Sequence, residues 1–132
     1  MSKVKGSRYE RELLHMFWDT GAWSGIRCPG SGSTPLPSPD LLVTNKTSYL
    51  AIECKAIKGR SKYFSEEEIQ QLTNFAEAFG ALPLIGIRFN GKGWYFLKPE
   101  QLKRTKNKFY VATLDLAQKE AMRFEKLTGG IL

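Results

Sequence analysis

Residues 39–55, PDLLVTNKTSYLAIECK, predict two adjacent β-strands that carry both acidic and basic side chains. The short run 41–43 and the longer run 48–55 are mostly apolar, as strands in a folded core are. The polar residues 44–47 between them are typical of a turn. This stretch therefore favours a β-hairpin in which charged groups lie at the ends of neighbouring strands.

Charged side chains should meet at one end of this hairpin. Because strand side chains alternate, Glu53 and Lys55 project from one face of their strand and the apolar neighbours from the other. Asp40 opens the first strand, so we expect it to converge with that pair. Ionisable groups in so apolar a strand are unusual unless they are paired or functional.

Two carboxylates beside an ammonium are the groups that metal-dependent phosphodiester hydrolysis requires. Mg²⁺ takes oxygen ligands from one or two carboxylates and keeps several waters, which leaves room for a phosphate oxygen. Asp40 and Glu53 match that requirement, and Lys55 could position a nucleophile or stabilise developing charge. Without metal, repulsion between the carboxylates should raise the pKa of one of them. The alternative is a surface salt bridge, because Asp followed by Glu-x-Lys is common by chance.

A third acidic residue, Glu10, lies on a helix predicted over residues 7–20. The apolar residues on its side of the helix, at about 100° per residue, are Leu13, Leu14 and Phe17. Glu10 should therefore point inward, where a shared metal ion or an ion pair with Arg27 or Lys55 would compensate its charge. The opposite, solvated side should carry Arg8, Glu12, His15 and Asp19.

Composition favours one domain that binds a polyanion. The chain has 132 residues, 42% of them hydrophobic, so residues 1–132 are expected to form a single domain around one core. Twenty Lys and Arg residues against thirteen Asp and Glu give a net charge of +7, which makes nucleic acid the leading candidate partner. No stretch approaches the roughly 18 apolar residues of a membrane span, and the amino terminus lacks a secretory signal. An intracellular protein is expected.

Cysteine and histidine chemistry is not expected. Cys28 and Cys54 form no zinc-like cluster, and a reducing cytosol argues against a disulfide, so Cys54 is best explained as a core residue. His15 is the only histidine and lies on the polar helix face. This excludes a histidine-based zinc site.

The remaining pattern predicts a mixed sheet and further helices. A short edge strand over 23–27 precedes the loop 28–34, whose glycines and serines could contact a phosphate or form a plain surface connection. Ser65 and Glu68 form a capping box that begins a helix ending at Gly80. The other expected elements are a strand at 81–89, a turn at 90–93, a strand at 94–97, a helical turn at 99–102 and a helix at 116–127, whereas 56–63 show no apolar period.

Basic residues recur in three groups along the chain. These groups are Lys3, Lys5, Arg8 and Arg11, then Lys58, Arg60 and Lys62, then Lys103, Arg104, Lys106 and Lys108. The first two groups could hold a duplex backbone across the acidic residues, which would supply affinity but little sequence selection. The third group is expected to be a solvated face.

Taken in order, these motifs resemble the archaeal-type Holliday junction resolvases of the PD-(D/E)XK nuclease superfamily, over nearly the full length. The residues that carry the resemblance are KGSRYERE at 5–12, Arg27 with the Ser31-containing loop, Pro39-Asp40, Ile52-Glu53-Cys54-Lys55, and GIRF at 86–89 leading to Gly93-Trp94. The roles it implies are acidic metal ligands at Glu10, Asp40 and Glu53, a transition-state stabiliser at Lys55 and a catalytic-loop serine at Ser31. Arg11 and Arg27 would assist near the phosphate. The residues expected to contact DNA are Lys5, Arg8, Arg11, Arg27, Ser33, Lys58, Arg60, Lys62 and Arg88.

The resemblance also implies a fold, a substrate and an assembly. The expected fold is α/β, with a central mixed β-sheet flanked by helices in a restriction-endonuclease-like core. A two-fold homodimer would nick two opposed strands of four-way junction DNA in recombination and repair, with Mg²⁺ as cofactor and Mn²⁺ as a substitute. No small-molecule substrate and no membrane are expected, and the protein should be cytoplasmic and nucleoid-associated. The alternatives are a nuclease for another DNA structure, such as a flap, and a noncatalytic basic module that binds nucleic acid.

Overall fold

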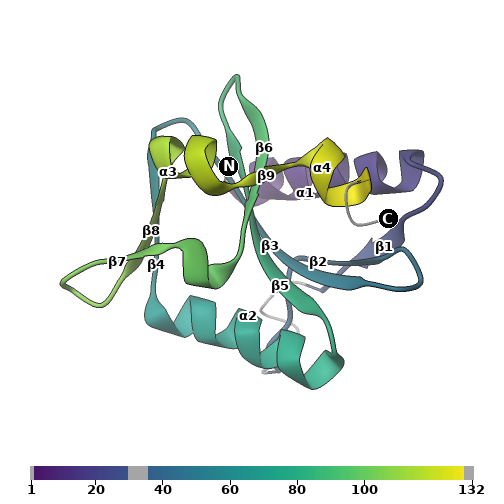
Figure 1. Cartoon of the computed structure of the whole chain (residues 1–132), viewed down its shortest axis with the longest axis horizontal. Helices are drawn as coiled ribbons and strands as arrows, with labels where there is room; N and C mark the ends of the chain where they lie inside the picture. Colours follow the sequence, from purple (N-terminus) through teal and green to yellow (C-terminus); the bar gives the residue numbers. More distant parts are fainter. Residues whose placement is uncertain (1, 30–35, 130–132) are drawn as a thin grey trace.

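A mixed six-stranded sheet forms the centre of the molecule (Figure 1). The computed structural model describes residues 2–29 and 36–129, with side chains from residue 6 onward. The strands are β1 Ser24–Arg27, β2 Leu41–Thr44, β3 Tyr49–Ile57, β4 Ser61–Phe64, β5 Leu82–Phe89, β6 Gly93–Leu97, β7 Lys103–Arg104, β8 Tyr110–Thr113 and β9 Met122–Arg123. The helices are α1 Ser2–Asp19, α2 Glu66–Phe79, α3 Leu114–Glu120 and α4 Phe124–Gly129, with a 3₁₀ turn η2 at Pro99–Gln101. The order in the main sheet is β1-β2-β3-β5-β6-β9.

The predicted hairpin is confirmed as β2 and β3. The two strands are antiparallel, with Leu41 opposite Ile52 and Thr44 opposite Tyr49. The next neighbour, β5, runs parallel to β3, while β6 returns antiparallel to β5. The sheet is therefore mixed, and the predicted edge strand β1 pairs antiparallel with β2.

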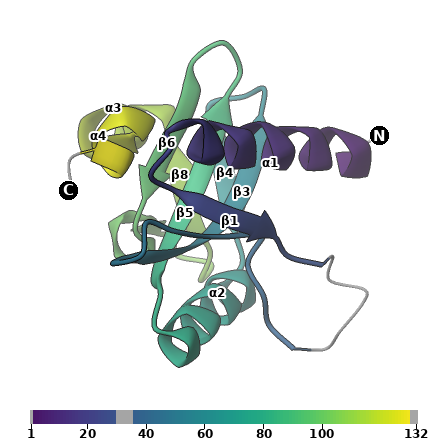
Figure 2. The same ribbon diagram turned by 90° about the vertical axis from the view of Figure 1, so that its right-hand side faces the viewer.

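Helices cover both faces of this sheet, α1 on one side and α2 on the other (Figure 2). Alternation along β3 divides its side chains between the two layers. Leu50, Ile52 and Cys54 join the cluster beneath α1, and Ala51 joins the cluster beneath α2. Because the period is two residues, Glu53 and Lys55 share the α2 side of the strand. Cys54 is a buried core residue, as the sequence predicts.

The helix α2 begins and ends where its sequence signals predict. The Ser65 side chain accepts a hydrogen bond from the Glu68 N–H, and the Glu68 side chain accepts one from the Ser65 N–H. At the other end Gly80 has φ of 86°, a left-handed conformation that glycine adopts without strain. The stripe of apolar residues buried toward β3 and β5 includes Ile69, Leu72 and Ala76.

Two parts of the secondary structure depend on contacts between distant segments. The stretch 56–63, which shows no apolar period in the sequence, contains strand: β3 continues to Ile57, and β4 joins β8 and β7 in a second, three-stranded sheet. The single helix predicted over 116–127 is two helices separated by β9. Met122 pairs with Phe96 of β6. The Arg123 side chain donates to backbone carbonyls across the sheet, so tertiary contacts override local helical propensity there.

Helix α1 begins earlier than predicted, at Ser2 rather than near Ser7. Within the described ranges, no helix has both the length and the apolar character needed to cross a membrane.

Candidate active site

Asp40 is fixed by hydrogen bonds to both neighbouring strands. Its N–H donates to the Ile52 carbonyl at 3.0 Å, and its carbonyl accepts from the Cys28 N–H at 2.9 Å. Its side-chain Oδ2 accepts from the Cys54 N–H at 2.8 Å. The residue before it, Pro39, is buried. The backbone of β3, the strand that carries Glu53, therefore holds the Asp40 carboxylate in place.

Lys55 lies between two carboxylates. Its Nζ is 4.0 Å from Glu53 Oε2 and 3.9 Å from Glu68 Oε2. The sequence predicts the first of these contacts from strand alternation. The second is not predictable locally, because Glu68 comes from the first turn of α2 and reaches the site only through packing of α2 against β3.

Glu10 points inward from α1, as predicted, and pairs with Arg27 at the end of β1. Arg27 Nε and Nη2 lie 3.3 Å and 3.2 Å from Glu10 Oε1. The same Nη2 donates to Ser7 Oγ at 2.6 Å, so two residues of α1 hold this guanidinium. The carboxylate is only 19% exposed, and the arginine 33%. Of the two ion pairs considered from the sequence, the structure therefore contains the one with Arg27.

Burial raises the pKa of all three carboxylates, and the charge of Asp40 raises those of Glu53 and Glu10 further. Burial, followed by repulsion from Asp40, raises the pKa of Glu53 to about 8. Burial and then the charge of Asp40 also raise the pKa of Glu10, although Arg27 opposes this. The pKa of Asp40 is raised by burial, against the Cys54 N–H and the nearby Lys55 ammonium, which lower it. The predicted electrostatic strain between these carboxylates is thus present in the protein without metal.

The donor chemistry fits a magnesium site built on two carboxylates better than one built on three. In the described part of the chain, no group of three or more His, Cys, Asp or Glu side chains is arranged to hold a metal ion. Glu10 Oε1 is occupied by Arg27. Asp40 and Glu53 remain as hard oxygen donors, and Mg²⁺ needs only one or two protein carboxylates. The metal, and Glu10 as one of its ligands, stay predictions.

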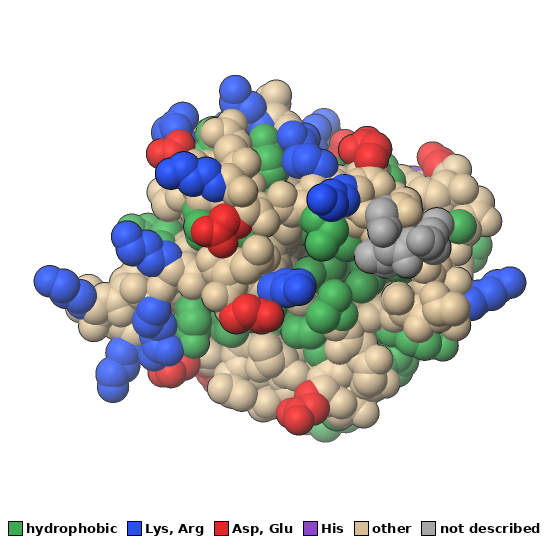
Figure 3. All heavy atoms as spheres, viewed as in Figure 1, with side chains coloured by type: hydrophobic (Ala, Val, Ile, Leu, Met, Phe, Trp, Pro, Cys, Tyr) green, Lys and Arg blue, Asp and Glu red, His purple; other side chains and the backbone are tan. Residues whose placement is uncertain are grey.

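The residues predicted to contact DNA are placed unevenly. On the face seen in Figure 3, Lys and Arg side chains gather over the part of the molecule where Figure 1 labels β7. This strand carries none of the residues predicted to contact DNA. Arg8, Arg11 and Lys58 are exposed. Arg60 is paired with Asp115 at 3.1 Å, and both side chains are largely exposed. Ser31 and Ser33 lie outside the described residues, as does the side chain of Lys5.

Glu12 lies at the edge of the solvated face, with its side chain 40% exposed, and is held by two partners that the helical wheel does not predict. Its Oε1 accepts hydrogen bonds from Arg88 Nε at 2.9 Å and from Trp94 Nε1 at 3.0 Å. The face of α1 that packs on the sheet is wider than the apolar stripe, because partners on β5 and β6 satisfy a charged group at its margin. No local pattern in the sequence predicts this contact, because 76 residues separate Glu12 from Arg88.

The fold is of the restriction-endonuclease-like class, and the gathered carboxylates and amine are the groups that a nuclease of this class would use. Asp40 lies immediately before β2, next to Glu53 and Lys55 of β3, and a helix across the sheet brings Glu10 near Asp40. A family model described as archaeal Holliday junction resolvase (Hjc) matches residues 1–131. The chain belongs to the archaeal Holliday junction resolvase family.

Similar proteins agree with this assignment. The chain is 37% identical over 133 residues to the crossover junction endodeoxyribonuclease Hjc of Archaeoglobus fulgidus, covering 96% of this chain and 97% of that protein. It is 33% identical over 104 residues to the crossover junction endodeoxyribonuclease Hje of Saccharolobus solfataricus, covering 76% of each. The crystal structure of Archaeoglobus fulgidus Hjc, a Holliday junction resolvase, superposes with a TM-score of 0.86 at 32% identity, covering 94% of this chain and all of that one. The expected fold class is confirmed.

Proposed function

We propose that this protein is a structure-selective endonuclease that nicks two opposed strands of a four-way DNA junction, in recombination and repair. One observation carries the proposal: Asp40, just before β2, is gathered with Glu53 and Lys55 of β3, and the pKa of both carboxylates is raised. Membership of the resolvase family and relatives named crossover junction endodeoxyribonucleases support the choice of substrate. Such a substrate would place the protein inside the cell, with the nucleoid.

Mg²⁺ is the cofactor that we propose, with Mn²⁺ able to replace it. Asp40 and Glu53 would hold the ion, and Glu10 would join them only if its carboxylate left Arg27. A bound divalent ion supplies two effects in such sites, a lowered pKa for a coordinated water and neutralisation of charge on the phosphate. The positive charge would also favour the ionised form of both carboxylates, whose pKa values are raised by burial and, for Glu53, also by the charge of Asp40.

The protein's own side chains would prepare the phosphate for attack. The Lys55 ammonium is placed to stabilise negative charge that develops on the phosphate oxygens. Glu53 and Glu68 lie 4.0 Å and 3.9 Å from the Lys55 Nζ and would restrict the movement of the ammonium group. Arg27, held by Ser7 and Glu10, would contact a phosphate near the cut. Ser31, which lies between β1 and β2 in the sequence, is the serine that would assist the reaction.

A homodimer would place two such sites on a substrate that is itself two-fold symmetric. A cluster of aromatic side chains supports this proposal. Phe75 and Phe79 of α2 stack at 5.3 Å, and Tyr49 of β3 meets Phe79 at 6.1 Å. Phe79 is 50% exposed and Tyr49 is 44% exposed. Contiguous exposed aromatic surface of this kind is typical of protein interfaces.

Cleavage of defined substrates tests the proposal. Purified protein with Mg²⁺ should nick a four-way junction in two opposed strands, and it should leave a linear duplex and a flap largely intact. Equal rates on all three substrates would reject junction selectivity. A shift of the junction on a native gel without any nick, in Mg²⁺ or Mn²⁺, would instead identify a noncatalytic binding module.

A further inference from the structure

Arg88 is held in place by three residues from two different elements. Its Nε donates to Glu12 Oε1 at 2.9 Å, and its guanidinium carbon lies 4.6 Å from the centre of the Tyr9 ring. The same oxygen of Glu12 accepts from Trp94 Nε1, and Trp94 is only 4% exposed. The carboxylate is thereby fixed to the sheet. Arg88, whose long side chain would otherwise sample many rotamers, is thus confined to one direction.

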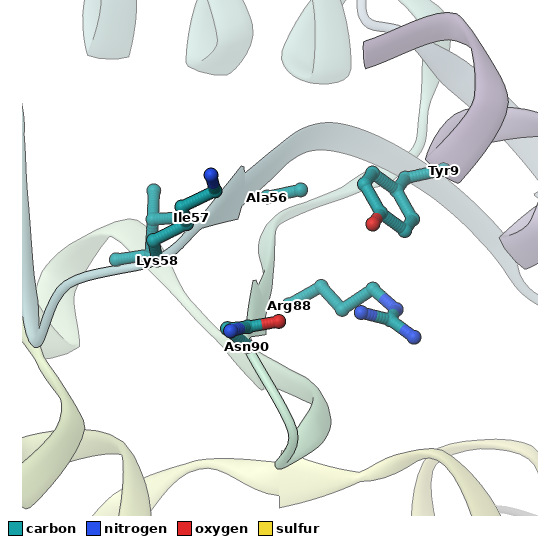
Figure 4. A pocket seen from close by; sticks show the side chains of 6 residues that line it. All are labelled: Tyr9, Ala56, Ile57, Lys58, Arg88 and Asn90. Carbon is teal, nitrogen blue, oxygen red and sulfur yellow. The ribbon is translucent and has the colours of Figure 1, made fainter. Parts of the chain in front are cut away.

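The terminal nitrogens of this guanidinium remain available. In the described part of the chain, no hydrogen bond joins Arg88 Nη1 or Nη2 to another residue. The side chain is 26% exposed and lines a small hollow (Figure 4). Figure 4 shows Arg88 extending toward Tyr9, with Lys58 and Asn90 at the other end of the hollow. A guanidinium with Nε bonded and its outer edge free presents two donors to an anion, and a phosphate oxygen pair fits them.

The position of Arg88 relative to the acidic residues suggests which anion it meets. In the parallel pairing of β3 and β5, Ala56 is the partner of Arg88 and Lys55 the partner of Ile87. Arg88 therefore lies one residue beyond Lys55, on the opposite face of the sheet. A DNA strand whose scissile phosphate lay at Lys55 would carry its next phosphates past this end of the sheet.

We propose that Glu12 is a positioning residue that presets Arg88 to bind a non-scissile phosphate of the junction, with Tyr9 and Trp94 completing the support. The inference rests on the proposed function, because it needs a DNA substrate. It assigns a role to a carboxylate that would otherwise repel DNA. Preorganisation reduces the conformational entropy that Arg88 loses on binding, and this gain outweighs the repulsion between Glu12 and the phosphate.

The sign of one substitution separates positioning from simple electrostatics. Glu12→Gln removes a negative charge beside the DNA, so electrostatics alone would leave junction binding unchanged or make it tighter. Positioning predicts the opposite: a loss of about threefold to tenfold in junction affinity, measured by fluorescence anisotropy without cleavage in Ca²⁺ or chelator. Asp19→Asn is the matched control, since it removes the same charge from the same helix and should not weaken binding. Unchanged or tighter binding by Glu12→Gln would overturn the proposal.

A double-mutant cycle tests that Glu12 acts through Arg88. Arg88→Gln should weaken junction binding by about tenfold. It should also lower the magnitude of the slope of log affinity against log salt by about one, the change expected for one lost phosphate contact. Glu12→Gln added to Arg88→Gln should then cause no further loss. Additive losses would show that Glu12 only supports the fold, and would overturn the proposal. In each variant, the loss of nicking should be larger at limiting protein than at saturating protein, because the proposed contact acts on junction binding.

Failure of the inference and failure of the proposed function can be told apart. If wild-type protein binds and nicks the junction while Glu12→Gln matches it, only the role of Glu12 is rejected. If the wild-type protein neither binds nor nicks the junction, the substrate itself is rejected. Thermal melting of each variant, with binding measured well below the melting temperature, shows that the folded fraction is the same in every comparison.

Discussion

Asp40 Oδ2 accepts a hydrogen bond from the backbone N–H of Cys54, across the β2–β3 hairpin. A main-chain donor between Glu53 and Lys55 therefore orients the carboxylate that starts the neighbouring strand. This bond involves only Oδ2, so the other carboxylate oxygen, Oδ1, does not take part in it. The acidic pair is thus arranged by the register of the sheet and not by loops.

Removal of either acidic residue should separate binding from cleavage. Asp40→Asn or Glu53→Gln should lower junction nicking by at least about a hundredfold, because a charged oxygen ligand is lost from the reacting centre. Junction affinity should stay close to that of wild type, since the basic residues are untouched. Nicking and gel-shift assays on the same preparations measure both. Metal-dependent cleavage by purified Asp40→Asn at the wild-type rate would contradict the assignment.

Metal-free protein should lose stability as the pH rises from about 4.5 to about 8, because of Glu53. In that window the unfolded chain releases the proton while the folded protein keeps it, so the folded state binds more protons and stability falls with pH. Glu53→Gln removes the effect and should stabilise the metal-free protein at pH 8.5 by roughly 2–4 kcal/mol, with little change at pH 4.5. Denaturant unfolding in chelator measures this.

Glu77→Gln is the control for that experiment, because Glu77 is an exposed residue of α2. It removes the same charge and should not change the free energy of unfolding by more than about 0.5 kcal/mol at either pH. Equal stabilisation of Glu53→Gln at both values of pH would show that its carboxylate is not strained in the folded protein.

Divalent ions should stabilise the folded protein through the same carboxylates. At a concentration near 100 times the dissociation constant, Mg²⁺ or Mn²⁺ should add about 2.7 kcal/mol to the free energy of unfolding. The effect should be larger at pH 8.5 than at pH 6, since Glu53 must lose its proton to bind the ion. Melting curves with and without metal test this. An equal metal-induced shift in Asp40→Asn would place the ion elsewhere.

The aromatic cluster on α2 should be needed for dimerisation. Phe79→Glu puts a charge into this exposed patch and should convert the protein to monomers, which sedimentation equilibrium would detect. Cuts in the two opposed strands should then become independent events. Phe109→Glu is the matched control, because Phe109 is a 44% exposed aromatic outside the cluster. A dimer that persists in Phe79→Glu would require another interface.

Local signals in the sequence predict most of the main sheet and part of the site. Hairpin pairing follows from alternation around residues 44–47, and the limits of α2 follow from Ser65, Glu68 and Gly80. The proximity of Glu53 and Lys55 needs only the two-residue period of a strand. These features depend on neighbours in sequence, which is why composition and spacing are enough.

Contacts between distant segments are the part that the sequence does not reveal. The second sheet exists because β4 meets β8, about fifty residues later, and β9 exists because Arg123 reaches backbone carbonyls near Trp94. In the site, the approach of Glu68 to Lys55 and the bond from Arg27 to Ser7 depend on how helices pack on the sheet. Periodicity on one helix does not give the position of a partner on another element, so the contacts of Glu12 with Arg88 and Trp94 are not predictable from the sequence.

The capping box of α2 has a consequence for the reacting centre. One oxygen of Glu68 accepts from the Ser65 N–H at the start of the helix, and the other lies 3.9 Å from Lys55 Nζ. The Glu68 side chain therefore connects the fraying of the first turn of α2 to the surroundings of the Lys55 amine. Whatever loosens the first turn of α2 will also change the local field at Lys55, so secondary-structure stability and chemical competence vary together at this point of the fold.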